Sequence, residues 1–171
     1  KAQARIFRHL CVTSWERFLA NYRRIRKESQ ANFNFSRKVI WRKIYLYYSR
    51  EPDLKLLENW ENDYWERVEN QTTLFPETEK TLRSLLSQYQ LALITNAQEQ
   101  KNSSNHRLGQ FPELKRLFEA IVIAGESGVP PKPDRTPFLL CLKSLGIAPS
   151  EAIYVGDDWH IDVCGANNVG I

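Results

Sequence analysis

The second half of the sequence alternates between helical segments and short apolar runs, and this alternation constrains the fold more than any other feature. The apolar runs are Leu91–Thr95, Ala120–Ala124 and Ala152–Gly156, and the segments with helical periodicity are Glu79–Gln88, Glu113–Phe118 and Pro137–Leu145, the last stopped by Gly146. Short buried strands separated by helices are typical of a parallel sheet covered by helices. We therefore expect an α/β fold in this part of the chain.

The first part of the sequence predicts helices only. Its apolar residues recur at three- and four-residue steps in three stretches, which contain Trp15, Phe18 and Tyr22, then Val39, Ile40 and Ile44, then Leu57, Trp60 and Tyr64. This spacing places them on one face of each helix. The pattern changes near Leu74, which divides the 171 residues into a predicted helical segment, 1–73, and a predicted α/β part, 74–171.

Positive charge is concentrated at one end of the chain. Residues 1–50 hold 13 Lys or Arg against 2 Asp or Glu, a net charge of +11, whereas the whole chain carries +4. Aromatic residues interleave with these charges, as they do in proteins that bind single-stranded nucleic acid: Trp15, Tyr22, Phe33, Phe35 and Trp41. Most of them fall on the apolar helical stripes, so core packing beneath a solvated basic face is the better interpretation and nucleic acid is not an expected partner. A basic face would also attract an anionic substrate.

Composition excludes several classes of protein. No apolar run approaches the roughly 20 residues that a membrane span requires, and the N-terminal segment does not resemble a secretory signal. The three cysteines, Cys11, Cys141 and Cys164, are scattered and odd in number, which argues against a disulfide framework or a zinc site. We expect a soluble cytoplasmic protein with no membrane partner.

Polar residues follow the first two expected strands, at the edge where ligands collect in parallel α/β sheets. Thr95 and Asn96 end the first run and could hold an anionic oxygen, although, taken alone, they are better explained as a helix cap. Lys132 stands in a loop between Pro131 and Pro133. A loop lysine is most often plain solvated surface, but rigid proline on both sides is uncommon for a lysine without a role.

Three carboxylates crowd together directly after the third run: Asp157, Asp158 and Asp162. Their mutual repulsion would be relieved by a cation. Mg²⁺ takes one or two carboxylates from a protein and completes its shell with water and phosphate oxygens. A helix N-cap explains one of these carboxylates but not all three. We therefore predict a Mg²⁺ site at Asp157, Asp158 and Asp162.

The order and spacing of these residues resemble the haloacid dehalogenase (HAD) superfamily. Its second, third and fourth motifs are similar to Ile94-Thr95-Asn96, Lys132-Pro133 and Gly156-Asp157-x-x-x-x-Asp162. The resemblance covers residues 74–171 and implies a HAD-like, Rossmann-type parallel sheet. The helical segment before it resembles the C1-type cap that many members insert between their first and second motifs.

The resemblance also implies a role for each matching residue. Thr95 and Asn96 would bind the transferring phosphoryl group, and Lys132 would steady its charge and that of the nucleophile, which makes Thr95 and Lys132 the expected catalytic residues. Asp157 would bind Mg²⁺, with Asp162 in support and Asp158 as a further candidate ligand. The implied activity is that of a Mg²⁺-dependent phosphatase that hydrolyses a small phosphorylated substrate through an aspartyl phosphate.

The sequence contains no Asp-x-Asp, the form of the family's first motif, which carries the attacking aspartate. We expect that motif on a strand shortly upstream of Lys1, and a further strand beyond Ile171, so that the chain is truncated at both ends of the fold. One alternative is a non-catalytic HAD-like module that binds a phosphorylated ligand or a partner protein. Another is a haloacid dehalogenase, which is disfavoured because such enzymes usually lack the Gly-Asp-x-x-x-x-Asp form of the last motif.

Overall fold

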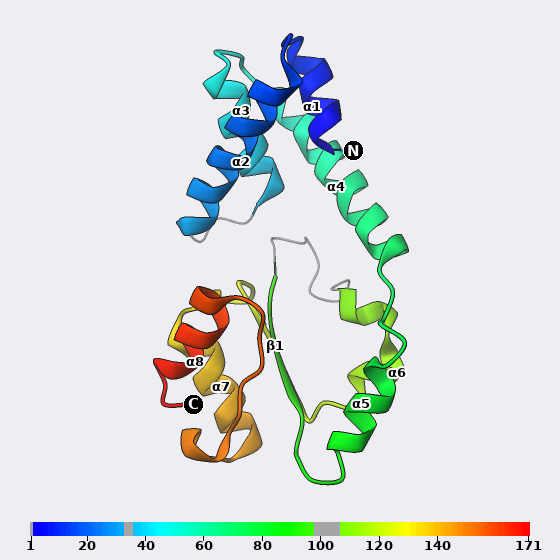
Figure 1. Ribbon diagram of the computed structural model, residues 1–171, viewed down its shortest axis with the longest axis vertical. Helices are drawn as coiled ribbons and strands as arrows, with labels where there is room; N and C mark the ends of the chain where they lie inside the picture. Colours follow the sequence, from blue (N-terminus) through cyan, green and yellow to red (C-terminus); the bar gives the residue numbers. More distant parts are fainter. Residues whose placement is uncertain (1, 33–35, 98–106) are drawn as a thin grey trace. The chain divides into compact units, whose positions relative to one another are not determined.

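The computed structural model describes residues 2–32, 36–97 and 107–171. The chain divides into two compact units, Lys1–Gln71 and Thr72–Ile171 (Figure 1), which we call the helical unit and the α/β unit. The helical stripes of the sequence fall in the first unit, and the apolar runs fall in the second.

Helices alone make up the described part of the helical unit: α1 (Ala2–Leu10), α2 (Trp15–Ala31), α3 (Arg37–Tyr47) and α4 (Leu54–Gln71). Short polar side chains fix where three of these helices begin, because each accepts hydrogen bonds from backbone N–H groups that have no partner within the first turn. These capping residues are Ser14 for α2, Ser36 for α3 and Asp53 for α4.

The apolar stripes of the helical unit meet in a core of their own, in which Phe18, Ile40, Ile44 and Leu57 are fully buried. Two of the five aromatic residues that were considered for base stacking belong to this core, since Tyr22 is 4% and Trp41 1% exposed. The indole N–H of Trp41 donates a hydrogen bond of 3.2 Å to the hydroxyl of Tyr22. Their burial supports the packing interpretation over base stacking. Trp15 is 36% exposed, and Phe33 and Phe35 lie outside the described residues.

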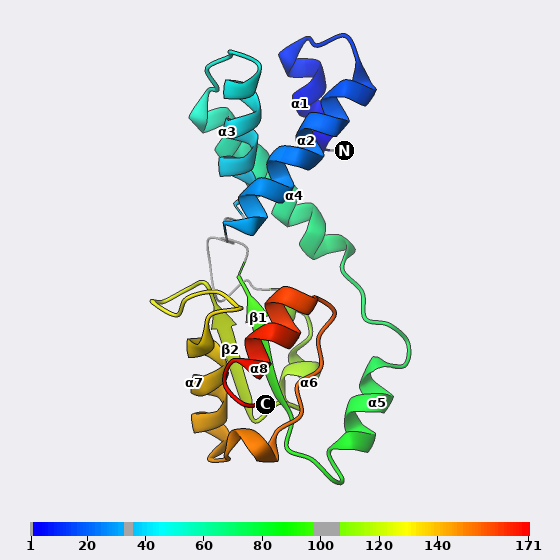
Figure 2. The same ribbon diagram turned by 60° about the vertical axis from the view of Figure 1, so that its left-hand side comes forward.

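The α/β unit is built on two parallel strands, β1 (Ala92–Asn96) and β2 (Ala120–Ala124). Ala92 pairs with Ala120 and Asn96 with Ala124, so both strands end at the same edge. The helices of this unit are α5 (Thr78–Leu85), α6 (Pro112–Lys115), α7 (Arg135–Leu145) and α8 (Cys164–Asn167), with short turns η2 (Arg107–Gln110), η3 (Pro149–Glu151) and η4 (Trp159–Val163). Figure 2 shows α7 running beside the strands, and its Phe138 is fully buried. The predicted α/β fold is confirmed.

The third apolar run, Ala152–Gly156, is not a strand, so this part of the prediction was wrong. Val155, which we expected to be buried, is 89% exposed, and Ile153 is 83% exposed. A strand forms only where a neighbouring strand exchanges backbone hydrogen bonds with it. Among the described residues the sheet consists of β1 and β2, which pair with each other and not with this segment.

Several smaller expectations have clear outcomes. Gly146 ends α7 in the left-handed conformation, at φ +68°, as its place after an apolar helix predicts. The three cysteines are free thiols. Over the described ranges, no helix is long and apolar enough to cross a membrane.

Candidate functional site

The end of β1 is joined to the proline-flanked loop by an amide side chain. Asn96 donates from Nδ2 to the carbonyl oxygen of Lys132 at 3.2 Å, and its Oδ1 accepts from the backbone N–H of Lys132 at 2.8 Å. Both polar atoms of one side chain therefore bind both backbone groups of one residue. This pairing fixes the loop against the strand end and brings together two of the predicted phosphate-binding residues.

Lys132 is buried, at 8% exposure, and its ammonium group has three hydrogen-bond acceptors. Nζ donates to Asp162 Oδ1 at 2.6 Å, to the hydroxyl of Tyr154 at 2.9 Å and to the carbonyl oxygen of Ile94 at 3.2 Å. An ammonium group has three protons, so its hydrogen-bonding capacity is filled. Lys132 is thus held in place and largely removed from solvent, while its role at a phosphoryl group stays a prediction.

Asp162 is the counter-charge of Lys132 and is 5% exposed. Its Oδ1 also accepts from the Tyr154 hydroxyl at 3.0 Å, and its Oδ2 accepts from the backbone N–H of Asp158 at 3.1 Å. Burial by itself would raise the pKa of this carboxyl group. The hydrogen bond from Lys132, the one from the Asp158 amide and the charge of Lys132 outweigh burial, so the pKa lies below its ordinary value.

Tyr154 completes this buried group, although the sequence analysis did not single it out. Its hydroxyl accepts from Lys132 and donates to Asp162, and its ring packs edge-on against Phe138 with the ring centroids 5.1 Å apart. Burial, followed by the charge of Asp162, raises the pKa of Tyr154 well above its usual value, so the hydroxyl keeps its proton. A sequence signal existed: in Ile153-Tyr154-Val155 the tyrosine is the only residue with a polar tip, and a buried tyrosine hydroxyl needs a partner.

Position 156 requires a glycine because Asp162 packs directly against its backbone. A Cβ atom built on Gly156 would collide with the Cβ and Cγ atoms of Asp162. Any larger residue at this position must therefore displace the carboxylate that pairs with Lys132. The packing of Asp162 against the backbone therefore explains why position 156 is a glycine, whether or not a ligand binds nearby.

The two remaining carboxylates lie in different environments. Asp158 Oδ1 accepts from the backbone N–H groups of His160 and Ile161, at 3.0 and 2.9 Å, so this side chain caps the helical turn η4. Asp157 is exposed and has no hydrogen-bond or ion-pair partner among the described residues. The same residues contain no cluster of three or more His, Cys, Asp or Glu side chains arranged to hold a metal ion. The metal role of Asp157, Asp158 and Asp162 stays a prediction.

The fold brings three of the predicted site residues together. Asn96, Lys132 and Asp162 are joined by hydrogen bonds, and Tyr154 belongs with them. Thr95 lies in β1 directly before Asn96, opposite Ile123 in the strand register. Asn96 and Lys132 are 36 positions apart in the sequence, and Lys132 and Asp162 are 30 positions apart. These three residues therefore meet at one end of the sheet although they are distant in sequence.

Known proteins resemble this chain in sequence. Ribulose-1,5-bisphosphate 5-phosphatase of Halopiger xanaduensis is 32% identical over 113 residues, which cover 63% of this chain and 44% of that protein. Glyceraldehyde 3-phosphate phosphatase of Methanopyrus kandleri is 40% identical over 67 residues, which cover 36% of this chain and 28% of that protein. The chain spans less than half the length of these two relatives.

Solved structures share the fold. A 2-haloacid dehalogenase from Pseudomonas syringae pv. Tomato DC3000 superposes with a TM-score of 0.61 at 23% identity, covering 99% of this chain and 74% of the other. A HAD phosphatase from Thermococcus onnurineus gives 0.60 at 21% identity, covering 99% and 72%. The family model of haloacid dehalogenase-like hydrolases matches residues 8–171, nearly the whole sequence. The chain therefore belongs to the haloacid dehalogenase-like hydrolase family.

Proposed function

We propose that this chain is part of a Mg²⁺-dependent phosphatase that hydrolyses a small phosphate monoester. The observation that carries the proposal is the buried ammonium of Lys132, held 2.6 Å from Asp162 and tied through its backbone to Asn96. Support also comes from relatives named as phosphatases, one for a sugar bisphosphate and one for a triose phosphate. A fixed cation beside hydroxyl and amide groups suits the charge of a transferring phosphoryl group.

In this proposal Thr95 and Asn96 bind the phosphoryl oxygens and Lys132 offsets their charge. Of the three contacts of Lys132 Nζ, the one to the Ile94 carbonyl is the longest, at 3.2 Å, and it involves a neutral acceptor. A phosphate oxygen can replace that contact, while Asp162 and Tyr154 continue to hold the ammonium in place. The cation then needs no rearrangement when charge develops, which is the main source of electrostatic catalysis.

The carboxylates of Asp157, Asp158 and Asp162 suit a Mg²⁺ ion that takes few of its ligands from the protein. Asp157 offers an exposed carboxylate without a partner among the described residues, whereas Asp158 is engaged as a cap and Asp162 with Lys132. We assign direct metal contact to Asp157, support to Asp162, and a weaker contribution to the second oxygen of Asp158. The remaining ligands would be water and phosphate oxygens. Bound Mg²⁺ would reduce the repulsion between an attacking carboxylate and the phosphate.

The reaction needs an attacking aspartate, which this proposal places on the Asp-x-Asp strand expected ahead of Lys1. Its carboxylate oxygen would form a bond to phosphorus while the bond from phosphorus to the leaving alcohol breaks. Water would then release inorganic phosphate from the aspartyl phosphate. Residues of the present chain contribute binding and charge in both steps.

The test is hydrolysis of a panel of phosphate monoesters by a protein that contains this chain with the expected strand. Activity should require Mg²⁺, disappear with EDTA, and fall at least 100-fold in Lys132→Ala, because removal of one transition-state charge contact costs about 3 kcal/mol. Lys143→Ala removes an exposed lysine of α7 and serves as the matched control. Hydrolysis that persists in EDTA, or an equal loss in both variants, would contradict the proposal.

A non-catalytic module is the second candidate, because the sequence contains no Asp-x-Asp. Such a protein would bind inorganic phosphate or vanadate through Asn96 and Lys132 without hydrolysing any ester. Binding of phosphate that is lost in Lys132→Ala, together with no hydrolysis across the panel, would favour this candidate. Chloride release from a chlorinated acid in the same assays would instead indicate a dehalogenase.

A further inference from the structure

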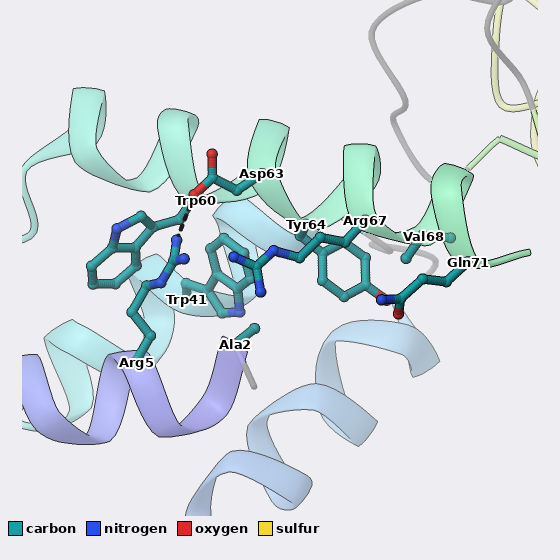
Figure 3. A pocket seen from close by; sticks show the side chains of 9 residues that line it. All are labelled: Ala2, Arg5, Trp41, Trp60, Asp63, Tyr64, Arg67, Val68 and Gln71. Atoms are coloured by element: carbon teal, nitrogen blue, oxygen red, sulfur yellow. Dashed lines mark hydrogen bonds and ion pairs between the residues drawn. The ribbon is translucent and has the colours of Figure 1, made fainter.

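The helical unit contains a pocket that shares no residue with the strand-end group of the α/β unit. Its volume is about 250 Å³, and residues of α1, α3 and α4 line it (Figure 3). This volume lies just under the range of roughly 300–1,000 Å³ that is usual for small-molecule sites. The walls include three aromatic side chains and three charged ones: Trp41, Trp60 and Tyr64, and Arg5, Asp63 and Arg67.

One arginine of this pocket is already neutralised. Arg5 Nη1 lies 2.9 Å from Asp63 Oδ2, and the guanidinium carbon of Arg5 lies 5.5 Å from the centre of the Trp60 ring. The ion pair joins α1 to α4 and holds Arg5 over the indole face. The charge of Asp63 is therefore already balanced by Arg5.

The other arginine has no such partner. Within the described part of the chain, no hydrogen bond or ion pair engages Arg67. Figure 3 shows its side chain extending from α4 into the pocket, in the direction of Trp41 and Tyr64, with the guanidinium group of Arg5 also pointing inward. Tyr64 already contacts Arg37, since its hydroxyl accepts from Arg37 Nη2 at 3.2 Å and the Arg37 guanidinium carbon lies 4.9 Å from the centre of its ring. Tyr64 lines the pocket with the part of its side chain that Arg37 leaves uncovered. The pocket thus carries one uncompensated positive charge beside aromatic walls.

These groups define the ligand that fits. Aromatic walls favour a flat apolar body, and a guanidinium group binds a carboxylate through two parallel hydrogen bonds. A cationic ligand would be repelled by Arg67 and would have to share Asp63 with Arg5, whereas a neutral ring would leave the charge of Arg67 unbalanced. The volume suits a single ring with its acidic group better than a nucleotide. We propose that this pocket binds a small aromatic carboxylate, with the ring against the aromatic walls and the carboxylate on Arg67.

Benzoate is the probe, and the indole N–H signals of the five tryptophans are the readout in a nuclear magnetic resonance titration. Benzoate should shift the signals of Trp41 and Trp60 in a saturable way and leave that of Trp159, an exposed residue of the α/β unit, unchanged. Benzylamine has the same ring and the opposite charge, and it should cause no saturable shift.

Arg67→Gln should lower the affinity for benzoate about tenfold, which is the effect of losing one charged hydrogen bond. Because Arg67 is exposed and makes no bond that the fold depends on, this variant should keep the wild-type circular dichroism spectrum and melting temperature. Arg26→Gln on α2 removes another exposed arginine without a partner among the described residues and is the matched control.

Three results would overturn the proposal. The first is the absence of a saturable shift at Trp41 or Trp60, and the second is equal affinity for benzoate in the two glutamine variants. The third is a benzoate response at Trp159 alone, since the anion would then bind in the α/β unit. None of these outcomes bears on phosphate-ester hydrolysis, so this proposal and the proposed function can fail separately.

Discussion

At the scale of single residues, the Tyr154 hydroxyl links the two charges of the buried ion pair. Tyr154→Phe keeps the ring against Phe138 but removes the contacts of 2.9 Å to Lys132 and 3.0 Å to Asp162. The free energy of unfolding should fall by about 1–3 kcal/mol, because two buried charged groups each lose a partner. Urea denaturation measures this loss. Tyr89→Phe, at a tyrosine that is 53% exposed, should change little, and equal effects of the two substitutions would contradict the assignment.

The same substitution tests whether Tyr154 positions Lys132. If the proposed phosphatase reaction holds, Tyr154→Phe should lower kcat about tenfold with little change in KM. Lys132 keeps its charge in this variant, so binding of the phosphate group persists, while the ammonium is held less firmly in the transition state. A rise in KM at unchanged kcat would show that Tyr154 acts on binding alone.

Asp162 makes stability depend on pH. Its pKa is lower in the folded chain than in the unfolded one, so its contribution is present above the unfolded pKa of about 4 and is lost as pH falls below that value. Asp162→Asn should destabilise the protein by roughly 3–5 kcal/mol at neutral pH, because it leaves Lys132 buried without a counter-charge. Urea denaturation across the pH range should show the difference from wild type shrinking below about pH 4. A difference that does not change with pH would refute the ion-pair explanation.

At the scale of elements, Ala152–Gly156 pairs with no strand among the described residues and presents Ile153 and Val155 to solvent. Exposed apolar side chains on an unpaired segment favour association between chains. Ile153→Lys with Val155→Lys should reduce self-association, measured by sedimentation velocity, while leaving the contacts of Tyr154 intact. Gln88→Lys with Gln90→Lys adds the same charge at exposed positions and serves as the control. Equal improvement in both double variants would mean that net charge, and not this segment, governs association.

The elements also show what sequence periodicity can predict. The stripes of α2, α3 and α4 and the runs of β1 and β2 were predictable, because burial within a helix or strand leaves a local pattern. The absence of a strand at Ala152–Gly156 was not predictable, because whether an apolar segment forms a strand depends on a neighbouring strand as well as on its own residues. Among the site residues, the motif spacing identified Asn96, Lys132 and Asp162, whereas the contacts of Tyr154 depend on how distant segments pack.

At the scale of the whole molecule, each unit has its own hydrophobic core, one around Phe18 and Trp41 and the other around Phe138. Between α4 and α5, Leu74 is 37% and Phe75 76% exposed. Thermolysin, which cuts ahead of large apolar residues, should cleave here and release the helical unit as a fragment that resists further digestion. Mass spectrometry of a digestion time course would identify this fragment. Digestion of α2 and α4 without accumulation of the fragment would show that the core of the helical unit does not suffice to keep it folded.

The amide pairing between Asn96 and Lys132 has a practical consequence for experiments on this protein. Among the described residues, the Asn96 side chain hydrogen-bonds to the main chain of Lys132, at 2.8 and 3.2 Å, so this pairing does not depend on the side chain at position 132. Substituting that lysine removes the counter-charge of the buried Asp162, but the loop keeps its amide anchor to β1. Lys132 variants can therefore serve as scaffolds for chemical rescue, in which an added alkylamine supplies the missing ammonium to a cavity whose backbone frame has stayed in place.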